Sequence, residues 1–432
     1  SLTGMGTLDA GSVKVNADGT ATAKALTQTP SISVNMVNIA ANTVVAILSA
    51  TQKAYIENVT ISNGSVEATS ILNDGTDEGA VAEIGSSFDQ AGYNALDEIG
   101  FDFSAVSAKI NIATALSDAT NYAYISGTSI GNAAARAGAV TVKVNGQSLA
   151  TAQIQEAAAS IGLISLGLTT LYADASGDFK AYIDTTGANI YAASILVENT
   201  YTSKANAQTT QAVGGVRASL VDVKGNLAIA SVTTNAEAAI KGNGTISTAG
   251  TVQVTANGTA DAFSGVMTPT ISISGIKIAA NILVSTLAAV QKAYIEDVAI
   301  KAAAGTTVSS TFNADPANGA RAILGSSAGS LGADISYYGF TANSATATAE
   351  ATNYAYVDGA SFGDALTRTG PLTVTSSGNS IALADISEGA LSAGYVSVGV
   401  AVLYAYANGD YRAYADTTGA LLNVDSLSVN NT

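Results

Sequence analysis

One long stretch of sequence occurs twice in this chain. Residues 52–57 return unchanged as residues 291–296, and residues 37–42 return in similar form as residues 276–281, at the same spacing. An enzyme seldom needs its whole scaffold twice in one chain, whereas a protein whose role depends on length and surface gains from repetition. The repeat therefore predicts a tandem array and favours a structural role.

A shorter period lies inside the two copies. A tripeptide of Ala, then Tyr or Ala, then Ile, Val or Ala, recurs about every 55 to 70 residues, which leaves room for several strands in each unit. Its first residues are Ala54, Ala123, Ala181, Ala238, Ala293, Ala355 and Ala413. We divide the chain into an N-terminal segment (1–12), a first copy (13–200), a diverged intermediate β unit (201–251) and a second copy (252–432).

The composition allows a core but one made of small side chains. Hydrophobic residues are 47% of the chain, aromatic residues only 6%, and Trp is absent. Charged residues are 12%, against about 25% in ordinary globular proteins. We expect thin, closely packed layers that bury mainly Ala and Val.

The strand signal is strong along most of the chain. Val, Ile, Thr and Tyr alternate with small or polar residues, a period of two that predicts an all-β fold. The alternation over residues 269–295 is far longer than an average strand. It predicts either one long strand or a strand that breaks at Gly275 and Asn281.

Glycine-containing segments inside the alternation predict hairpins. Residues 176–178 and 408–410 are expected to form three-residue loops, and Asn63–Gly64 a two-residue loop of type I′. The cross-strand neighbours expected from the longer loops are Asp174 with Lys180, Tyr172 with Tyr182, Tyr406 with Arg412 and Tyr404 with Tyr414.

The predicted fold class is therefore an elongated tandem-repeat architecture of long, mainly antiparallel strands and hairpins. The alternative is a right-handed parallel β-helix or solenoid, because Asn-Gly corners also occur in solenoids.

Charge limits the partners. The formal net charge is −16 and the pI is near 4.2, so the chain repels nucleic acid and anionic membrane surfaces. No window approaches the roughly 20 uninterrupted apolar residues of a membrane span, so no transmembrane segment is expected. The absence of Cys excludes disulfides and fits a surface-exposed or secreted bacterial protein.

Few catalytic groups remain. The chain has no His and no Cys, which removes Ser-His-Asp triads, thiol catalysis and the usual zinc and copper ligands. Glu57 could pair with Asp77 or Glu78 as glycosidase carboxylates, but no sequence pattern brings them together. The sequence predicts no catalytic residues and a protein that is not an enzyme.

One acidic turn is a candidate metal site. Asp74, Asp77 and Glu78 lie close together beside Gly75, and closely spaced carboxylates with a glycine kink can supply oxygen ligands to calcium. The alternative is a solvated acidic turn, and the counterpart at 313–319 keeps only one acid. No other cofactor is predicted.

The tyrosines concentrate in Ala-Tyr alternations, as at 122–124, 354–356 and 404–406. Rows of Tyr could stack sugars or line a contact with another subunit. The alternative is that they are ordinary strand residues.

The repeat style resembles that of a known class. The run over residues 396–402 and the Ala-Tyr-Ile steps resemble the repetitive region of bacterial leukotoxin-type filamentous adhesins, large exoproteins related in style to filamentous haemagglutinins. The resemblance implies an extended β-rich stalk or fibre outside the cell. It assigns no catalytic or receptor-binding role to any numbered residue.

Three hypotheses follow. The first is a non-enzymatic extracellular structural protein, a fibre or adhesin stalk segment that self-associates through unpaired strand edges and could meet a glycan or protein receptor. The second is a β-solenoid that binds or cleaves carbohydrate with Tyr and carboxylates. The third is a stalk or surface-layer module that stays monomeric.

Overall fold

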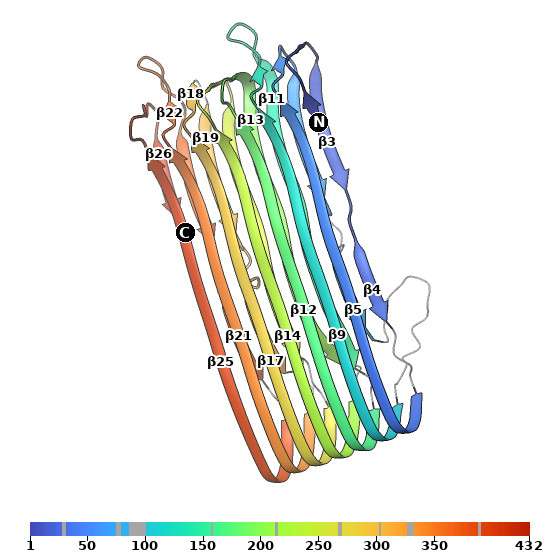
Figure 1. Cartoon of the computed structure of the whole chain (residues 1–432). Coiled ribbons are helices and arrows are strands. Elements are labelled where there is room, and N and C mark those ends of the chain that lie inside the picture. The colour runs from blue at the N-terminus through green and yellow to red at the C-terminus, as the bar shows by residue number, and fades with distance from the viewer. Residues whose placement is uncertain are drawn as a thin grey trace.

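The computed structural model describes residues 1–27, 32–74, 79–85, 101–156, 159–211, 215–266, 270–301, 304–325, 332–387 and 390–432. The described residues form strands and turns without a helix, in two long sheets that lie against each other (Figure 1). The prediction of an all-β fold is confirmed.

The front sheet consists of long strands that follow one another directly in space. Their order is β1-β5-β9-β12-β14-β17-β21-β25, and each long strand pairs in parallel with the next one along the chain. The bounds are β1 (Leu2–Thr3), β5 (Ile32–Glu57), β9 (Phe101–Ser126), β12 (Ala159–Asp184), β14 (Gly215–Lys241), β17 (Thr270–Glu296), β21 (Gly332–Asp358) and β25 (Ala390–Asp416).

The back sheet carries the return segments. Some returns are one long strand and others are broken into two. The bounds are β3 (Ser12–Gly19), β4 (Ala23–Thr27), β7 (Ser65–Leu72), β8 (Ala80–Ile84), β11 (Ala137–Glu156), β13 (Asn189–Gln211), β16 (Thr251–Val266), β19 (Gly305–Phe312), β20 (Ala320–Gly325), β23 (Leu372–Gly378), β24 (Ala382–Ser387) and β26 (Leu427–Asn431).

Short connector strands cross between the two sheets at one end. They are β2 (Thr7–Leu8), β6 (Thr60–Ile61), β10 (Ser129–Ile130), β15 (Thr245–Thr248), β18 (Ala299–Lys301) and β22 (Ser361–Phe362), and they stack in parallel as well. The chain thus runs along a long strand, crosses over, returns in the back sheet and begins the next coil.

The arrangement is a two-layer parallel stack, consistent with the solenoid alternative, and the predicted hairpins are wrong. Every strand pair recorded among the described residues is parallel. Residues 176–178 lie inside β12 and residues 408–410 lie inside β25. Asn63 and Gly64 do turn, with a φ of 85° at Gly64, but they join β6 to β7, which lie in parallel ladders with other coils.

The glycines of the predicted loops make room for aromatic rings. A Cβ on Gly177 would lie 2.3 Å from a ring carbon of Phe179, and a Cβ on Gly409 would lie 2.1 Å from one of Tyr411. Each ring leans over the glycine two residues before it on the same inward face. The glycine therefore keeps an extended backbone and supplies space, which a sequence pattern cannot distinguish from a turn.

The core is built from inward rows, where a row means the register-aligned positions of successive long strands. The Ala of the recurring tripeptide is one such row: Ala54 pairs with Ala123, and the register continues in steps to Ala413. Its members are buried from Ala54 to Ala355. The short period seen in the sequence is therefore the coil period.

Buried amides join the two sheets. Gln291 on β17 donates to the carbonyl oxygens of Ala256 (3.1 Å) and Thr311 (3.0 Å) in the back sheet. In the first copy Gln52 on β5 donates in the same way to Ala17 O (3.0 Å). Such bonds satisfy backbone oxygens where the inward rows would otherwise be apolar.

Each long strand bends sharply near its beginning, at the end opposite the connectors (Figure 1). One residue per strand has no register partner there, and we call these residues the corner row: Met36, Ala105, Leu163, Leu220, Gly275, Tyr337 and Tyr395. Gly275 thus marks a bend inside β17, whereas the strand runs unbroken through Asn281. The sequence prediction of a long strand is confirmed.

Candidate functional site

Tyrosines line the outward face of the front sheet near the connectors. Tyr55, Tyr124 and Tyr182 stack with ring centroids 5.1 and 4.8 Å apart and planes within 5° of parallel. The second copy repeats the stack, with centroid distances of 4.8 and 5.0 Å. Its members are Tyr294, Tyr356 and Tyr414. We call the two stacks the tyrosine ladder.

Ala239 interrupts the ladder between the two stacks. Around it, Tyr294 donates to the Glu237 carboxylate (2.7 Å), Lys241 pairs with the same carboxylate (3.2 Å), and the Lys241 ammonium lies 4.7 Å from the Tyr182 ring centre. Burial, with a contribution from Glu237, raises the pKa of Tyr182 to about 12. The rings cover one another's faces, so the stacked rings leave little room for a sugar to lie flat.

Two equivalent charged clusters lie next to the ladder. In the first copy, Asp178 accepts a hydrogen bond from the Tyr122 hydroxyl and pairs with Lys180 (3.0 Å). These contacts replace the predicted cross-strand pairs. Lys180 contacts Asp178 on its own strand and Tyr122 on the neighbouring strand β9, because the chain does not turn back after Asp178. The predicted partner Asp174 lies elsewhere in β12.

The second-copy cluster has the same design. Arg412 binds Asp410 with two hydrogen bonds (2.7 and 2.8 Å), and the Tyr354 hydroxyl donates to the same carboxylate. These two donors hold the pKa of Asp410 below its usual value, with Arg412 the larger cause. The hydrogen bond to Asp410 in turn raises the pKa of Tyr354.

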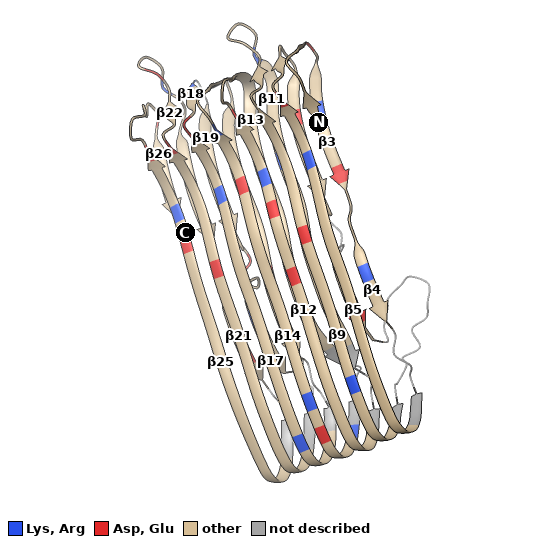
Figure 2. Cartoon of the chain, in the orientation of Figure 1, with Lys and Arg blue, Asp and Glu red and all other residues tan. Residues whose placement is uncertain are grey.

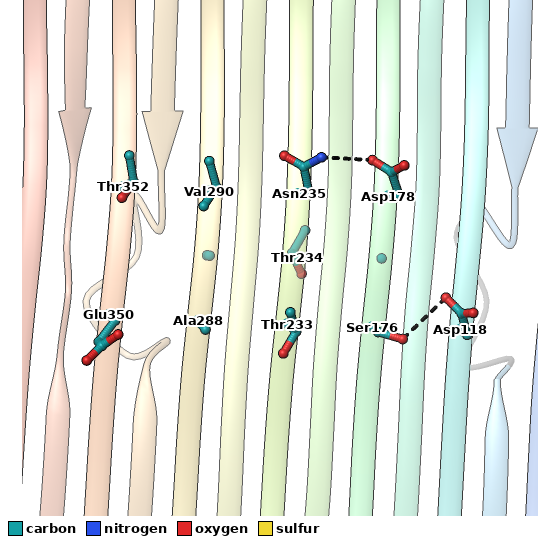
Figure 3. A pocket seen from close by; sticks show the side chains of 12 residues that line it. Asp118, Ser176, Asp178, Thr233, Thr234, Asn235, Ala288, Val290, Glu350 and Thr352 are labelled. Atoms are coloured by element: carbon teal, nitrogen blue, oxygen red, sulfur yellow. Dashed lines mark hydrogen bonds between the residues drawn. The ribbon is translucent and has the colours of Figure 1, made fainter.

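A shallow depression of about 440 Å³ lies beside these clusters on the outward face (Figure 3). Small side chains, Thr233 and Ala288, form its floor. Asn235 donates to Asp178 (3.1 Å) on one side, and Ser176 donates to Asp118 (3.3 Å). The depression arises because small residues on two strands lie between longer residues on their neighbours.

The depression does not bring its acids together for catalysis. Asp118 on β9 and Glu350 on β21 are separated by four strand spacings, about 19 Å at roughly 4.8 Å each, well beyond the carboxylate separations of glycosidases. Asp178 already accepts bonds from Tyr122, Lys180 and Asn235. What the depression offers is a hydrogen-bonding surface.

The predicted calcium residues fall partly outside the described residues. Asp77 and Glu78 lie in the segment 75–78, which is not described, and Asp74 is an exposed turn residue. Within the described ranges no group of three His, Cys, Asp or Glu side chains is placed to hold a metal ion. The calcium site stays a prediction.

The residue before Asp74 has a clear structural role. Asn73 has a positive φ of 57°, and its Oδ1 accepts a hydrogen bond from Ala21 N (2.7 Å) in the preceding coil. Asn313 repeats this geometry in the second copy and bonds Ala260 through both its oxygen (2.7 Å) and its nitrogen (3.0 Å). These asparagines bridge the breaks in the back-sheet strands.

The end of the stack was missed by sequence reasoning. On β25 the inward-facing Leu403 is 52% exposed, although Leu171 and Leu283 of the same row are 0% exposed. Neighbouring Ala405 and Ala407 are exposed too. At the other end β3 and β4 lie against β5 and Val44 is buried, whereas β23, β24 and β26 lie against β25 but leave Leu403 exposed. Within the described part of residues 1–432, β25 therefore exposes core-type side chains, and one of its edges has no strand partner.

No helix in the part of the chain that the structure describes is long and apolar enough to cross a membrane. Comparisons with protein-family models, with curated proteins and with solved structures found no match to this chain. The resemblance to filamentous adhesins thus stays a prediction that rests on repeat style.

Proposed function

We propose that this protein is a non-enzymatic extracellular structural protein that elongates into fibres by stacking its copies end to end. The single observation that carries the proposal is the parallel, in-register pairing of each long strand with the next, from β5 to β25, by which every coil presents the same kind of edge to its neighbour. A position outside the cell is supported by the adhesin-like repeat style and the lack of Cys.

The two ends are complementary in chemistry. The long edge of β25 offers unpaired backbone groups and apolar inward-facing side chains. Among the described residues, the long edge of β5 is paired only at Ile56 and Glu57, by the two residues of β1. An incoming β25 can continue the parallel register along β5 once β1 moves aside. The new β25–β5 pair would have the same parallel hydrogen bonding as the pairs between neighbouring long strands inside one copy.

Such a contact is head to tail. Different surfaces meet at each junction, so every added copy exposes the same end again, and the assembly grows without closing. Natural proteins usually keep exposed edge strands short, or place charged residues on them, to prevent pairing with another chain. On the edge strand β25, the inward-facing residues include Leu and Ala instead.

Neighbouring residues on β25 provide a matched test. Leu403 faces inward and Tyr404 faces outward, and they are exposed to 52% and 54%. We expect Leu403→Lys to place a charge against the next copy and to abolish fibres, whereas Tyr404→Lys leaves its charge in solvent and keeps them. Negative-stain microscopy and sedimentation velocity at several concentrations measure both.

Two outcomes count against the proposal. A wild-type chain that stays monomeric at all concentrations supports the single stalk or surface-layer module instead. Equal behaviour of the two variants shows that the association does not use the inward face of the end strand.

A further inference from the structure

Polarity reverses near the corner of the front sheet. The outward rows that begin at Val37, Ile39 and Ala41 contain only aliphatic or aromatic residues and Gly in every long strand. Further along the sheet the outward rows also carry Asp, Glu, Lys and Thr, mixed with exposed apolar residues such as Ile47 and Ile282. We call the described residues of the corner row and of the rows within five residues of it the tip.

The inward rows of the tip carry polar and charged residues among Ala and Gly. Ser107 and Asp222 are buried there, and Lys277 is the register neighbour of Asp222. Lys109 and Lys224 lie two residues further along, also on an inward row. Figure 2 accordingly shows a group of charges near the corner, separated from the group near the connectors by an uncharged stretch.

A row of asparagines marks where the polar interior ends. Asn42 donates to Asn111 (3.0 Å), Asn226 to Asn281 (2.7 Å) and Asn281 to Asn343 (2.8 Å), each across one coil. Beyond this row the interior is mainly apolar, beginning with Leu171 and Leu283, and its buried polar residues include Gln291. The tip thus carries apolar residues outside and polar residues inside, the reverse of the rest of the stack.

The apolar surface continues around the bend. In the corner row itself Met36 is 83% exposed and Tyr395 is 75% exposed, and Leu163 and Leu220 are exposed as well. Before the corner, Ile273 is one of several exposed apolar residues on the other side of the bend. The described tip is therefore apolar on both sides and at its convex end.

We infer that the tip inserts into the hydrocarbon of one leaflet of a lipid membrane. A second copy lying on the flat sheet would leave the convex corner and the far side in water, whereas lipid chains surround the tip and cover all three surfaces. The rows after the corner extend about 16 Å at roughly 3.3 Å per residue, close to half of the roughly 30 Å hydrocarbon core.

The interior arrangement fits that environment. Polar and charged groups within a membrane face the protein interior, and Asp222 is buried there at the register position next to Lys277. Each interior long strand has hydrogen-bonded partners on both sides. Only the β5 and β25 edges stay open, and the end-to-end stacking proposed above would close them, so in this one respect the inference rests on that proposal.

Flotation with phosphatidylcholine vesicles tests the inference. These vesicles carry no net charge, so binding to them cannot come from electrostatic attraction between protein and lipid. The wild-type chain is expected to float with the vesicles, and Leu163→Lys/Leu220→Lys, which charges the corner on two interior strands, is expected to lose at least tenfold in the bound fraction. The control Met5→Lys/Leu366→Lys adds the same charge at exposed apolar residues outside the tip and is expected to float like the wild type.

Because the chain has no Trp, a single one reports the depth of the corner. Leu163→Trp is expected to show a blue-shifted emission and quenching by brominated lipid, and Leu366→Trp neither. Fibres without flotation would overturn the inference and leave the proposed function standing. Flotation without fibres would support the inference and overturn the proposed function. Corner variants that change the oligomer size in the absence of lipid, while no variant floats, assign the tip to contacts between copies.

Discussion

At the scale of single residues, the interior is shaped by pairs of one small and one large side chain. Phe179 stacks on Tyr201 of the back sheet with ring centroids 5.3 Å apart, and both rings are buried. Their space comes from glycines: a Cβ on Gly146 would lie 2.6 Å from Phe179, and one on Gly258 would lie 2.3 Å from Tyr201. These glycines let each aromatic ring lie directly against the backbone of the strand that carries the glycine.

We predict that Gly177→Ala lowers the free energy of unfolding by about 1–3 kcal/mol, because the added methyl overlaps the Phe179 ring. A Cβ on Gly167, on the same strand, would lie 3.9 Å from Lys224 Cγ, an ordinary contact distance. Gly167→Ala should therefore be neutral or slightly stabilising. Urea unfolding monitored by circular dichroism compares the two, and equal losses of stability would contradict the assigned role of Gly177.

At the scale of elements, parallel in-register stacking makes each position meet the same position of the next coil. This explains both the tyrosine ladder and the asparagine row, since a repeated residue is placed one strand spacing from its copy. It also explains why strands as long as β17 stay continuous: neighbouring coils satisfy the backbone on both sides along nearly the whole length.

The ladder gives the fold a sensitivity to alkaline pH. Burial and then Glu237 raise the pKa of Tyr182 to about 12, from about 10 in an unfolded chain. The native state therefore favours the neutral hydroxyl, and this stabilisation is fully present below about pH 10 and is lost as the pH rises toward 12.

We expect the urea midpoint to fall progressively between about pH 10 and pH 12, and Tyr182→Phe to reduce the slope of that fall. Absorbance at alkaline pH follows the ionisation of the tyrosines in the same samples. A midpoint that does not change over this range would show that the ladder tyrosines titrate alike in the folded and unfolded states.

At the scale of the whole molecule, the chain combines an open end with a large like charge. Copies that stack must bring together particles of formal charge −16. Added salt shortens the Debye length from about 30 Å at 0.01 M to about 8 Å at 0.15 M and weakens this repulsion.

We predict that fibre growth is several-fold faster at 0.15 M than at 0.01 M salt, measured by light scattering at one protein concentration. Leu403→Lys should stay unassembled at both salt concentrations, because its defect is a buried charge at the junction. Growth that slows with salt would indicate that attraction between opposite charges holds the copies together.

The amino-acid sequence by itself determined the all-β class, the long strands and the coil period. Alternation is a local property, and a parallel stack needs the same small residue at the same place in each coil, as the row from Ala54 to Ala413 shows. It could not determine the direction of pairing, because parallel and antiparallel neighbours accept the same alternation and a glycine that makes room for Phe179 has the pattern of a turn.

Only the tertiary structure decided which face of each strand is inside. The corner row adds one unpaired residue per strand, and a shift of one residue exchanges the inward and outward rows. Ser274, before the corner, and Lys277, after it, therefore both lie on inward rows, although their positions differ by three and a regular strand would place them on opposite faces. The reversed polarity of the tip follows from this shift of one residue at the corner, which no local pattern contains.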